Sequence, residues 1–197
     1  LEFRRVLFRS DAGSTMTDST SYARNGTATN GPVSTTGEIG GRLSLDGTND
    51  YVNLGSNQTF LNGASAATYS IWVNPNNVSG SYNLISLSIN NGGTATSTSR
   101  MELSLNNANV QVMTQSDDAT SCTIVTTTNS MTAGSWHLVT GVVDVNANTV
   151  KIYVDGVAQA TSGTINLPGT AFPSTADASA AIGSQDDGDR KSTRLNP

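Results

Sequence analysis

Apolar residues along the chain come in short runs of about four to eight, separated by stretches rich in Ser, Thr, Asn and Gly. Short apolar runs bounded by turn-forming residues are typical of β-strands. We therefore predict strands at residues 42–45, 51–54, 68–74, 83–89, 100–105, 109–114, 122–127, 137–145, 149–154, 157–160 and 178–182. Because no segment has a convincing helical period, the pattern predicts an all-β protein, an antiparallel two-sheet β-sandwich.

Several of these strands alternate between apolar and polar positions. In the strand at 100–105, the apolar set is Met101, Leu103 and Leu105, and the polar set is Arg100, Glu102 and Ser104. Successive side chains of a strand point to opposite faces. We therefore expect one dry face and one wet face.

Residues 142–160 predict a three-stranded meander. Asn146, Ala147 and Asn148 separate its first two apolar runs, and Asp155-Gly156 follows the second. Asp-Gly between apolar runs is among the strongest short hairpin signals. Residues 11–39, in contrast, are rich in Asp, Ser, Asn and Gly and predict a loop.

The 197 residues are enough for one sizeable core, so we expect one domain at 11–189. The ends differ from it, because six of the ten Lys and Arg residues lie in the first nine or last eight positions. LEFRRVLFRS and DRKSTRLNP resemble in-frame translations of sequencing adaptors. We therefore interpret residues 1–10 and 190–197 as non-native tails around a fragment of a longer protein.

Composition narrows the possible partners. The segment 11–189 holds fourteen acidic residues against four Lys and Arg, a formal charge of −10. An acidic surface repels phosphate backbones, which argues against nucleic acid and makes a divalent cation plausible. Cys122 is the single cysteine, so an internal disulfide is impossible and a buried apolar role is expected. No apolar run approaches the roughly 18 residues of a membrane span, and we expect no membrane insertion.

Three segments in order resemble one family. GEIGGRLSLDGTNDYVNLG (37–55), TYSIWVNP (68–75) and WHLVTGVVDVNANTVKIYVDGVAQ (136–159) are similar to the laminin-G-like, concanavalin A-like jelly roll of bacterial secreted proteins. The resemblance implies a jelly roll that here lacks its first and last strands, which leaves open edges. It also implies that Trp72 and Trp136 belong to the core.

The same fold includes glycoside hydrolases, whose Glu-x-Asp-x-x-Glu strand holds two carboxylates about 5–5.5 Å apart. Glu occurs only at positions 2, 38 and 102, and none begins that motif. Asp46 and Asp50 flank a turn in LSLDGTNDYVNLG, where we expect Asp46 to cap backbone amides. His137 is the single histidine, and we expect a surface or packing role for it. We therefore expect no enzyme activity.

A calcium site is a more specific hypothesis than catalysis. Calcium takes six to eight oxygen ligands from Asp, Asn, Gln and carbonyl groups. One oxygen-rich segment, 18–25, begins at Asp18. A second, IGSQDDGD at 182–189, is similar to a pentraxin calcium segment, although Ser184 stands where that family has Glu. The candidate ligands are Asp18, Gln185, Asp186 and Asp187, with solvated acidic loops as the alternative.

The resemblance implies a non-catalytic carbohydrate-binding or adhesion module of a larger bacterial secreted or surface protein, with Ca²⁺ as a possible helper. The expected partner is a glycan or an extracellular protein, bound through rim loops. Tyr22, Tyr82 and Phe172 are the loop aromatics that could stack on a sugar. The alternatives are a structural spacer in an adhesin and an accessory module of a polysaccharide-degrading enzyme.

Overall fold

The computed structural model describes residues 8–9, 15–37, 41–56, 58–89, 99–114, 123–167, 169–172, 178–185 and 190–191. These residues form strands and turns without a helix. The strands are β1 (Phe8–Arg9), β2 (Thr15–Asp18), β3 (Gly26–Thr29), β4 (Val33–Thr36), β5 (Gly41–Ser44), β6 (Tyr51–Asn53), β7 (Ala66–Val73), β8 (Ser81–Ile89), β9 (Ser99–Asn106), β10 (Asn109–Thr114), β11 (Thr123–Ser130), β12 (His137–Asp144), β13 (Thr149–Val154), β14 (Val157–Ala158), β15 (Thr161–Thr164), β16 (Ala178–Ile182), β17 (Ser184–Gln185) and β18 (Arg190–Lys191).

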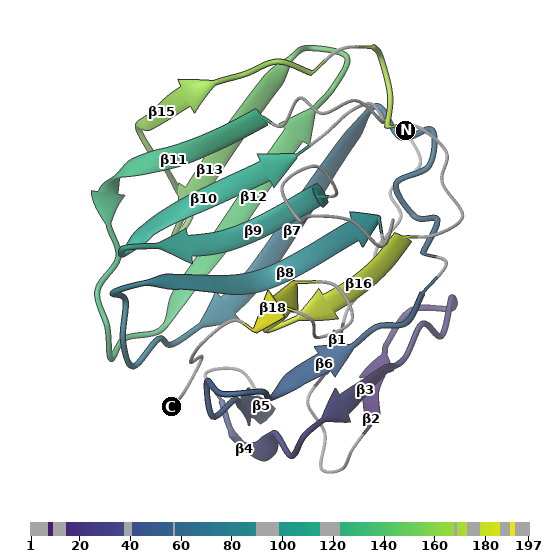
Figure 1. Cartoon of the computed structure of the whole chain (residues 1–197), viewed down its shortest axis with the longest axis vertical. Helices are drawn as coiled ribbons and strands as arrows, with labels where there is room; N and C mark the ends of the chain where they lie inside the picture. The colour runs from purple at the N-terminus through teal and green to yellow at the C-terminus, as the bar shows by residue number, and fades with distance from the viewer. Residues whose placement is uncertain are drawn as a thin grey trace.

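Two antiparallel sheets form the layers of a sandwich. The larger has ten strands in the order β1-β2-β3-β6-β16-β8-β9-β10-β11-β15, and the smaller has four in the order β14-β13-β12-β7. Figure 1 shows β8 to β11 in front, curving across β7, β12 and β13. Two short pairs, β4–β5 and β17–β18, lie outside these sheets. The predicted two-sheet jelly roll is confirmed.

Each of the eleven predicted strand segments overlaps a strand, and the meander is confirmed as β12-β13-β14. Asp155 and Gly156 both have positive φ, at 53° and 78°. Two consecutive positive φ angles are the requirement of a type I′ hairpin turn, which Asp-Gly satisfies at low steric cost.

The predicted loop at 11–39 is wrong in its described part, which contains β2, β3 and β4. Each of these strands has four residues, mostly Thr, Ser, Gly and Ala, so none produces an apolar run. They form through pairing: β3 pairs with β6, β2 pairs with β3, and β4 pairs with β5. Tertiary pairing overrides weak local signals here. The same explains the unpredicted β15, which pairs with β11.

The core fills the space between the two sheets. Its fully buried side chains include Leu84, Leu103 and Val112 from the large sheet, and Val139 and Ile152 from the small one. The expectation of a wet face on β9 is wrong, because Glu102 and Ser104 are only 4% and 2% exposed. β9 lies between β8 and β10 inside the large sheet, and both of its faces are buried at these positions.

The tail segments also contribute short pairings. Phe8 and Arg9 of β1 pair with Asp18 and Thr17 of β2. At the other end, β18 pairs with β17.

Candidate functional site

Trp72 lies on the outer face of the four-stranded sheet and is 42% exposed. The expectation that it belongs to the core is wrong. Tyr69 and Val73 of β7 point into the sandwich, whereas Thr68, Ser70 and Trp72 alternate with them and are exposed. The period-2 pattern of TYSIWV contained this signal, and the family resemblance had suggested the opposite orientation.

The surroundings of Trp72 combine apolar and hydrogen-bonding groups. In the sheet register Trp72 pairs with the half-buried Leu138 of β12, and Ser70 pairs with Thr140. The Ser70 and Thr140 hydroxyls are 2.8 Å apart and hydrogen-bonded. Tyr153 of β13 pairs with Thr140 and continues the row. The register thus places the Trp72 ring and three hydroxyl-bearing residues on one face of the sheet, in neighbouring rows. We call these residues the Trp72 face: Ser70, Trp72, Leu138, Thr140 and Tyr153.

Trp136, the other predicted core tryptophan, is half-buried. The guanidinium carbon of Arg42 lies 5.8 Å from the centre of its ring, within cation–π range. This ring therefore has a protein partner on one face, whereas the part of the structure described here gives the Trp72 ring no such partner.

The three loop aromatics proposed for sugar stacking differ in burial: two are buried and one is exposed. Tyr82 and Phe172 are 3% and 1% exposed and belong to the core. The Tyr82 hydroxyl donates a hydrogen bond to the carbonyl of Ser79. Tyr22 is 51% exposed. The Arg24 guanidinium lies 5.7 Å from the Tyr22 ring centre and 5.5 Å from that of Phe60.

Asp18, a predicted calcium ligand, is 5% exposed and closes the loop between β2 and β3. Its carboxylate accepts hydrogen bonds from the Thr20 amide at 2.9 Å, the Thr20 hydroxyl at 2.8 Å and the Arg24 amide at 2.9 Å. Its own amide donates to the side-chain oxygen of Asn25 at 2.9 Å. In this arrangement the carboxylate holds the loop that presents Tyr22.

The other predicted calcium ligands are not brought to Asp18 by any described contact. Asp186 and Asp187 lie outside the described residues, and so does the side chain of Gln185. Within the residues that are described, no group of three or more His, Cys, Asp or Glu side chains is placed to hold a metal ion. The calcium site stays a prediction.

The turn between Asp46 and Asp50 has the predicted capping role. Asp46 accepts the amides of Thr48 at 2.7 Å and Asn49 at 3.3 Å. The buried Asp50 carboxylate accepts the amide of Asp46 at 2.9 Å. Gly47 has a φ of 74°, which suits glycine. Both carboxylates therefore hold the turn.

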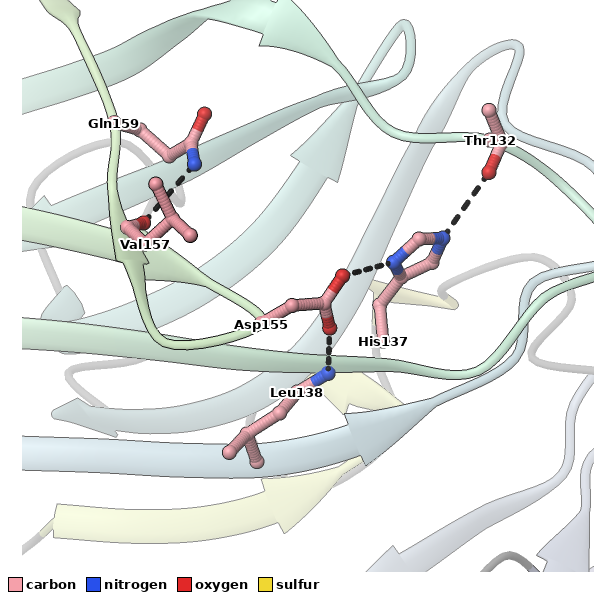
Figure 2. Close-up of polar contacts among 6 residues, drawn as sticks. All are labelled: Thr132, His137, Leu138, Asp155, Val157 and Gln159. Carbon is pink, nitrogen blue, oxygen red and sulfur yellow. Dashed lines mark hydrogen bonds and ion pairs between the residues drawn. The ribbon is translucent and has the colours of Figure 1, made fainter.

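His137 connects the start of β12 to the β13–β14 hairpin. Its Nδ1 lies 2.8 Å from Asp155 Oδ2, and its Nε2 lies 3.1 Å from the Thr132 hydroxyl (Figure 2). An ionised carboxylate only accepts, so Nδ1 donates the hydrogen bond to Asp155. Asp155 Oδ1 also accepts the Leu138 amide at 2.8 Å. The sequence could not show that these groups meet, because they come from three segments.

Acid should weaken the contact between His137 and Asp155. The hydrogen bond from His137 lowers the pKa of Asp155 below its ordinary 3.8. A lowered folded-state pKa adds stability above the unfolded pKa, and that stability is lost as pH falls through the folded value. Asp155 is half exposed, so the effect is small. Urea midpoints of the parent and Asp155→Asn, measured from pH 7 downward, should differ at neutral pH and converge progressively as the pH falls below about 4. A constant gap would contradict this contribution of the contact.

Comparison with known proteins agrees with this architecture. Residues 46–194 match the laminin-G family model described as the concanavalin A-like lectin/glucanases superfamily. The chain belongs to this superfamily. A search of curated proteins finds no significant match. In the described part of this superfamily member, no helix is long and apolar enough to cross a membrane.

Solved structures of the same fold are similar at low sequence identity. Domain 4 of AbnA, an extracellular GH43 arabinanase from Geobacillus stearothermophilus in complex with arabinotriose, has a TM-score of 0.58 at 18% identity, over 84% of this chain and 71% of its own. The binding domain of Paraclostridial Mosquitocidal Protein 1 has a TM-score of 0.57 at 13% identity, and the match covers 90% of this chain and 47% of that one. Trypanosoma rangeli sialidase has a TM-score of 0.60 at 17% identity, and the match covers 95% of this chain and 28% of that one. The chain thus spans less than half of the latter two.

Proposed function

We propose that the protein is a non-catalytic glycan-binding module of a larger bacterial protein that is secreted or displayed on the cell surface, and that a sugar stacks on Trp72. The observation that carries this proposal is the exposed Trp72 ring beside the hydroxyls of Ser70, Thr140 and Tyr153. An aromatic ring covers the apolar face of a sugar, and hydroxyls satisfy its polar rim.

The comparisons support a glycan as the ligand. The AbnA domain was solved with arabinotriose, and the sialidase was solved with a sialic acid derivative. These ligands belong to those proteins, and the low identities leave the identity of the sugar open. A sheet face gives a more rigid platform than a loop, which favours the Trp72 face over the rim loops that we expected.

The carboxylates support a non-catalytic role. Glycosidases need one carboxyl as acid and another as nucleophile or base. Asp18, Asp46, Asp50 and Asp155 each accept a backbone amide hydrogen bond, a role that holds turns. Calcium would be an additional element of the proposed module. Calorimetric titration with Ca²⁺ tests it, and absence of both heat and thermal stabilisation would count against the predicted ligands.

The test of the function is binding of soluble oligosaccharides, arabinotriose among them, measured by calorimetry on the parent, Trp72→Ala and Tyr22→Ala. Truncating a central tryptophan of an interface costs about 2 kcal/mol or more, which corresponds to a roughly 30-fold weaker affinity. We expect that loss for Trp72→Ala and little change for Tyr22→Ala, the exposed aromatic of the rim loop. Loss in Tyr22→Ala alone would move the site to the loop. Absence of binding by the parent across a glycan array would overturn the function.

A further inference from the structure

Thr132, His137 and Asp155 lie in a row, joined by two hydrogen bonds through the imidazole ring (Figure 2). The Thr132 hydroxyl oxygen is 3.1 Å from Nε2, and Asp155 Oδ2 is 2.8 Å from Nδ1. A hydroxyl at one ring nitrogen and a carboxylate at the other is the arrangement by which a base activates a nucleophile. The three residues thus have the positions of a nucleophile, a general base and the carboxylate that orients the base.

The carboxylate of Asp155 fixes the imidazole ring. Its Oδ2 accepts from His137 Nδ1 and its Oδ1 accepts the Leu138 amide at 2.8 Å, so both oxygens are engaged. The other ring nitrogen, Nε2, is then the one next to the Thr132 hydroxyl. In the neutral ring, whose single proton is on Nδ1, Nε2 has a lone pair that can take a proton. The His137 side chain is 15% exposed, so the ring is partly shielded from water.

The backbone on both sides of Thr132 is anchored. The Met131 amide donates to the Ala108 carbonyl at 2.7 Å. The Gly134 amide donates to the Pro75 carbonyl at 2.8 Å. A nucleophile that its neighbours hold in place loses little freedom when it reacts. The hydroxyl is therefore positioned against the ring before an acyl donor arrives.

The surroundings of Thr132 are open to a ligand. Residues 132–135 are all exposed, and a Cβ added at Gly134 would meet no atom within 4 Å. The amide of Ala133 has no acceptor among the residues that the structure describes. In acyl transfer, the amide directly after the nucleophile is a common donor to the oxygen that becomes negatively charged. An ester carbonyl therefore has an open approach here and a candidate hydrogen-bond donor.

We propose that Thr132 is a site of covalent acylation, where its hydroxyl attacks the carbonyl carbon of an ester, with His137 as general base and Asp155 as positioning residue. Thr132 Oγ1 forms a bond to the acyl carbon while its proton passes to Nε2. The bond between the acyl carbon and the alcohol oxygen of the ester then breaks, and that oxygen takes the proton from Nε2. The products are an acyl-threonine and a free alcohol.

This reaction goes beyond glycan binding and does not depend on it. It uses a single carboxylate, which stays ionised beside the ring, whereas a glycosidase needs two carboxyl groups at the sugar. It also leaves an acyl group on the protein, so the glycan is not its substrate. The donor class is an ester of a short carboxylic acid, because the open loop offers room without an apolar pocket for a long chain.

The test uses p-nitrophenyl acetate, an activated ester of this class, on the full chain. Peptide mapping by mass spectrometry locates the acetyl groups, and absorbance follows the release of nitrophenolate. We expect acetylation of Thr132 in the parent and of the same position in Thr132→Ser, which keeps the hydroxyl. Thr132→Val should lose the fast release. His137→Gln should slow it by about 100-fold or more. Ser135→Ala removes an exposed hydroxyl from the same loop and should leave the rate unchanged.

A double-mutant cycle tests whether Asp155 acts through the ring. In Asp155→Asn the amide oxygen can still accept the Leu138 amide, so this contact of the hairpin is kept. The change should slow acetylation of Thr132 in the parent and add nothing in the His137→Gln background. A purely structural role would slow both alike.

Circular dichroism and thermal melting establish that every variant is folded before rates are compared. An unlabelled Thr132 in the parent would overturn the proposal, and so would equal rates in the parent and His137→Gln. Fast release that persists in Thr132→Val would assign the reaction to the imidazole itself and overturn it as well. None of these measurements contains a glycan, so failure here and failure of the proposed glycan binding are distinguishable.

Discussion

Replacing Ile152 by alanine should lower the free energy of unfolding by about 2–5 kcal/mol, whereas Lys151→Ala should change it by less than about 0.5 kcal/mol. Ile152 is 1% exposed and points from β13 into the sandwich, while its neighbour Lys151 points to solvent. Truncating Ile152 removes buried methyl groups and leaves a cavity that the two sheets cannot close fully. Lys151 loses only a solvated chain.

Urea unfolding followed by circular dichroism measures both variants. The slope of the unfolding free energy against urea should be the same in the parent and the variants, because each exposes a similar surface on unfolding. Similar midpoints for Ile152→Ala and Lys151→Ala would mean that β13 does not alternate between core and solvent as described. The two substitutions lie at adjacent positions of β13 and both introduce alanine, so the strand propensity of the new residue is the same in both variants.

The second large effect is expected where a glycine of the small sheet faces side chains of the large sheet. Gly141 of β12 is buried, and a Cβ there would lie 2.8 Å from Val112 Cγ2 and 3.3 Å from Leu103 Cδ1 of the opposite sheet. Gly141→Ala should therefore cost about 1–3 kcal/mol through overpacking. Val112→Ala removes the nearest obstructing methyl group but leaves a cavity when made alone.

The double variant Gly141→Ala/Val112→Ala should be less destabilised than the sum of the two single changes, by about 0.5–3 kcal/mol. The added methyl then fills part of the space that valine vacates. Urea unfolding of the four proteins completes the cycle. Strict additivity would show that β12 and β10 do not oppose each other at this point.

The fold could be predicted largely because alternation and turn chemistry agree in the central strands. β13 has the period of two together with the Asp-Gly turn that follows it, and the structure shows both. β2 and β3 could not be predicted, since their Thr- and Gly-rich sequences become strands only through pairing with β6. Pairing partners distant in sequence are not visible in a local pattern.

The candidate site illustrates a different limit. The exposure of Trp72 follows from the alternation of β7, which puts Trp72 on the same face as Thr68 and Ser70. This information is local, whereas the family resemblance implied a core position. The contact between His137 and Asp155 was not local, because it depends on a hairpin folding back onto β12. The burial of Glu102 was not local either, because alternation places it opposite the core face of β9 and does not show what lies against that second face.

The carboxylates that hold the turns have a consequence for how freely this sequence can vary. Asp46 and Asp144 accept backbone amides through a side-chain oxygen, and Asn53 and Asn77 do the same elsewhere in the structure. Asn and Asp offer a similarly placed oxygen to an amide. Each exchange between them at such a position changes the net charge of the protein by one, while the same turn persists. The acidity of the protein is thus a property that evolution can adjust to a salty or crowded surrounding without redesigning the sandwich.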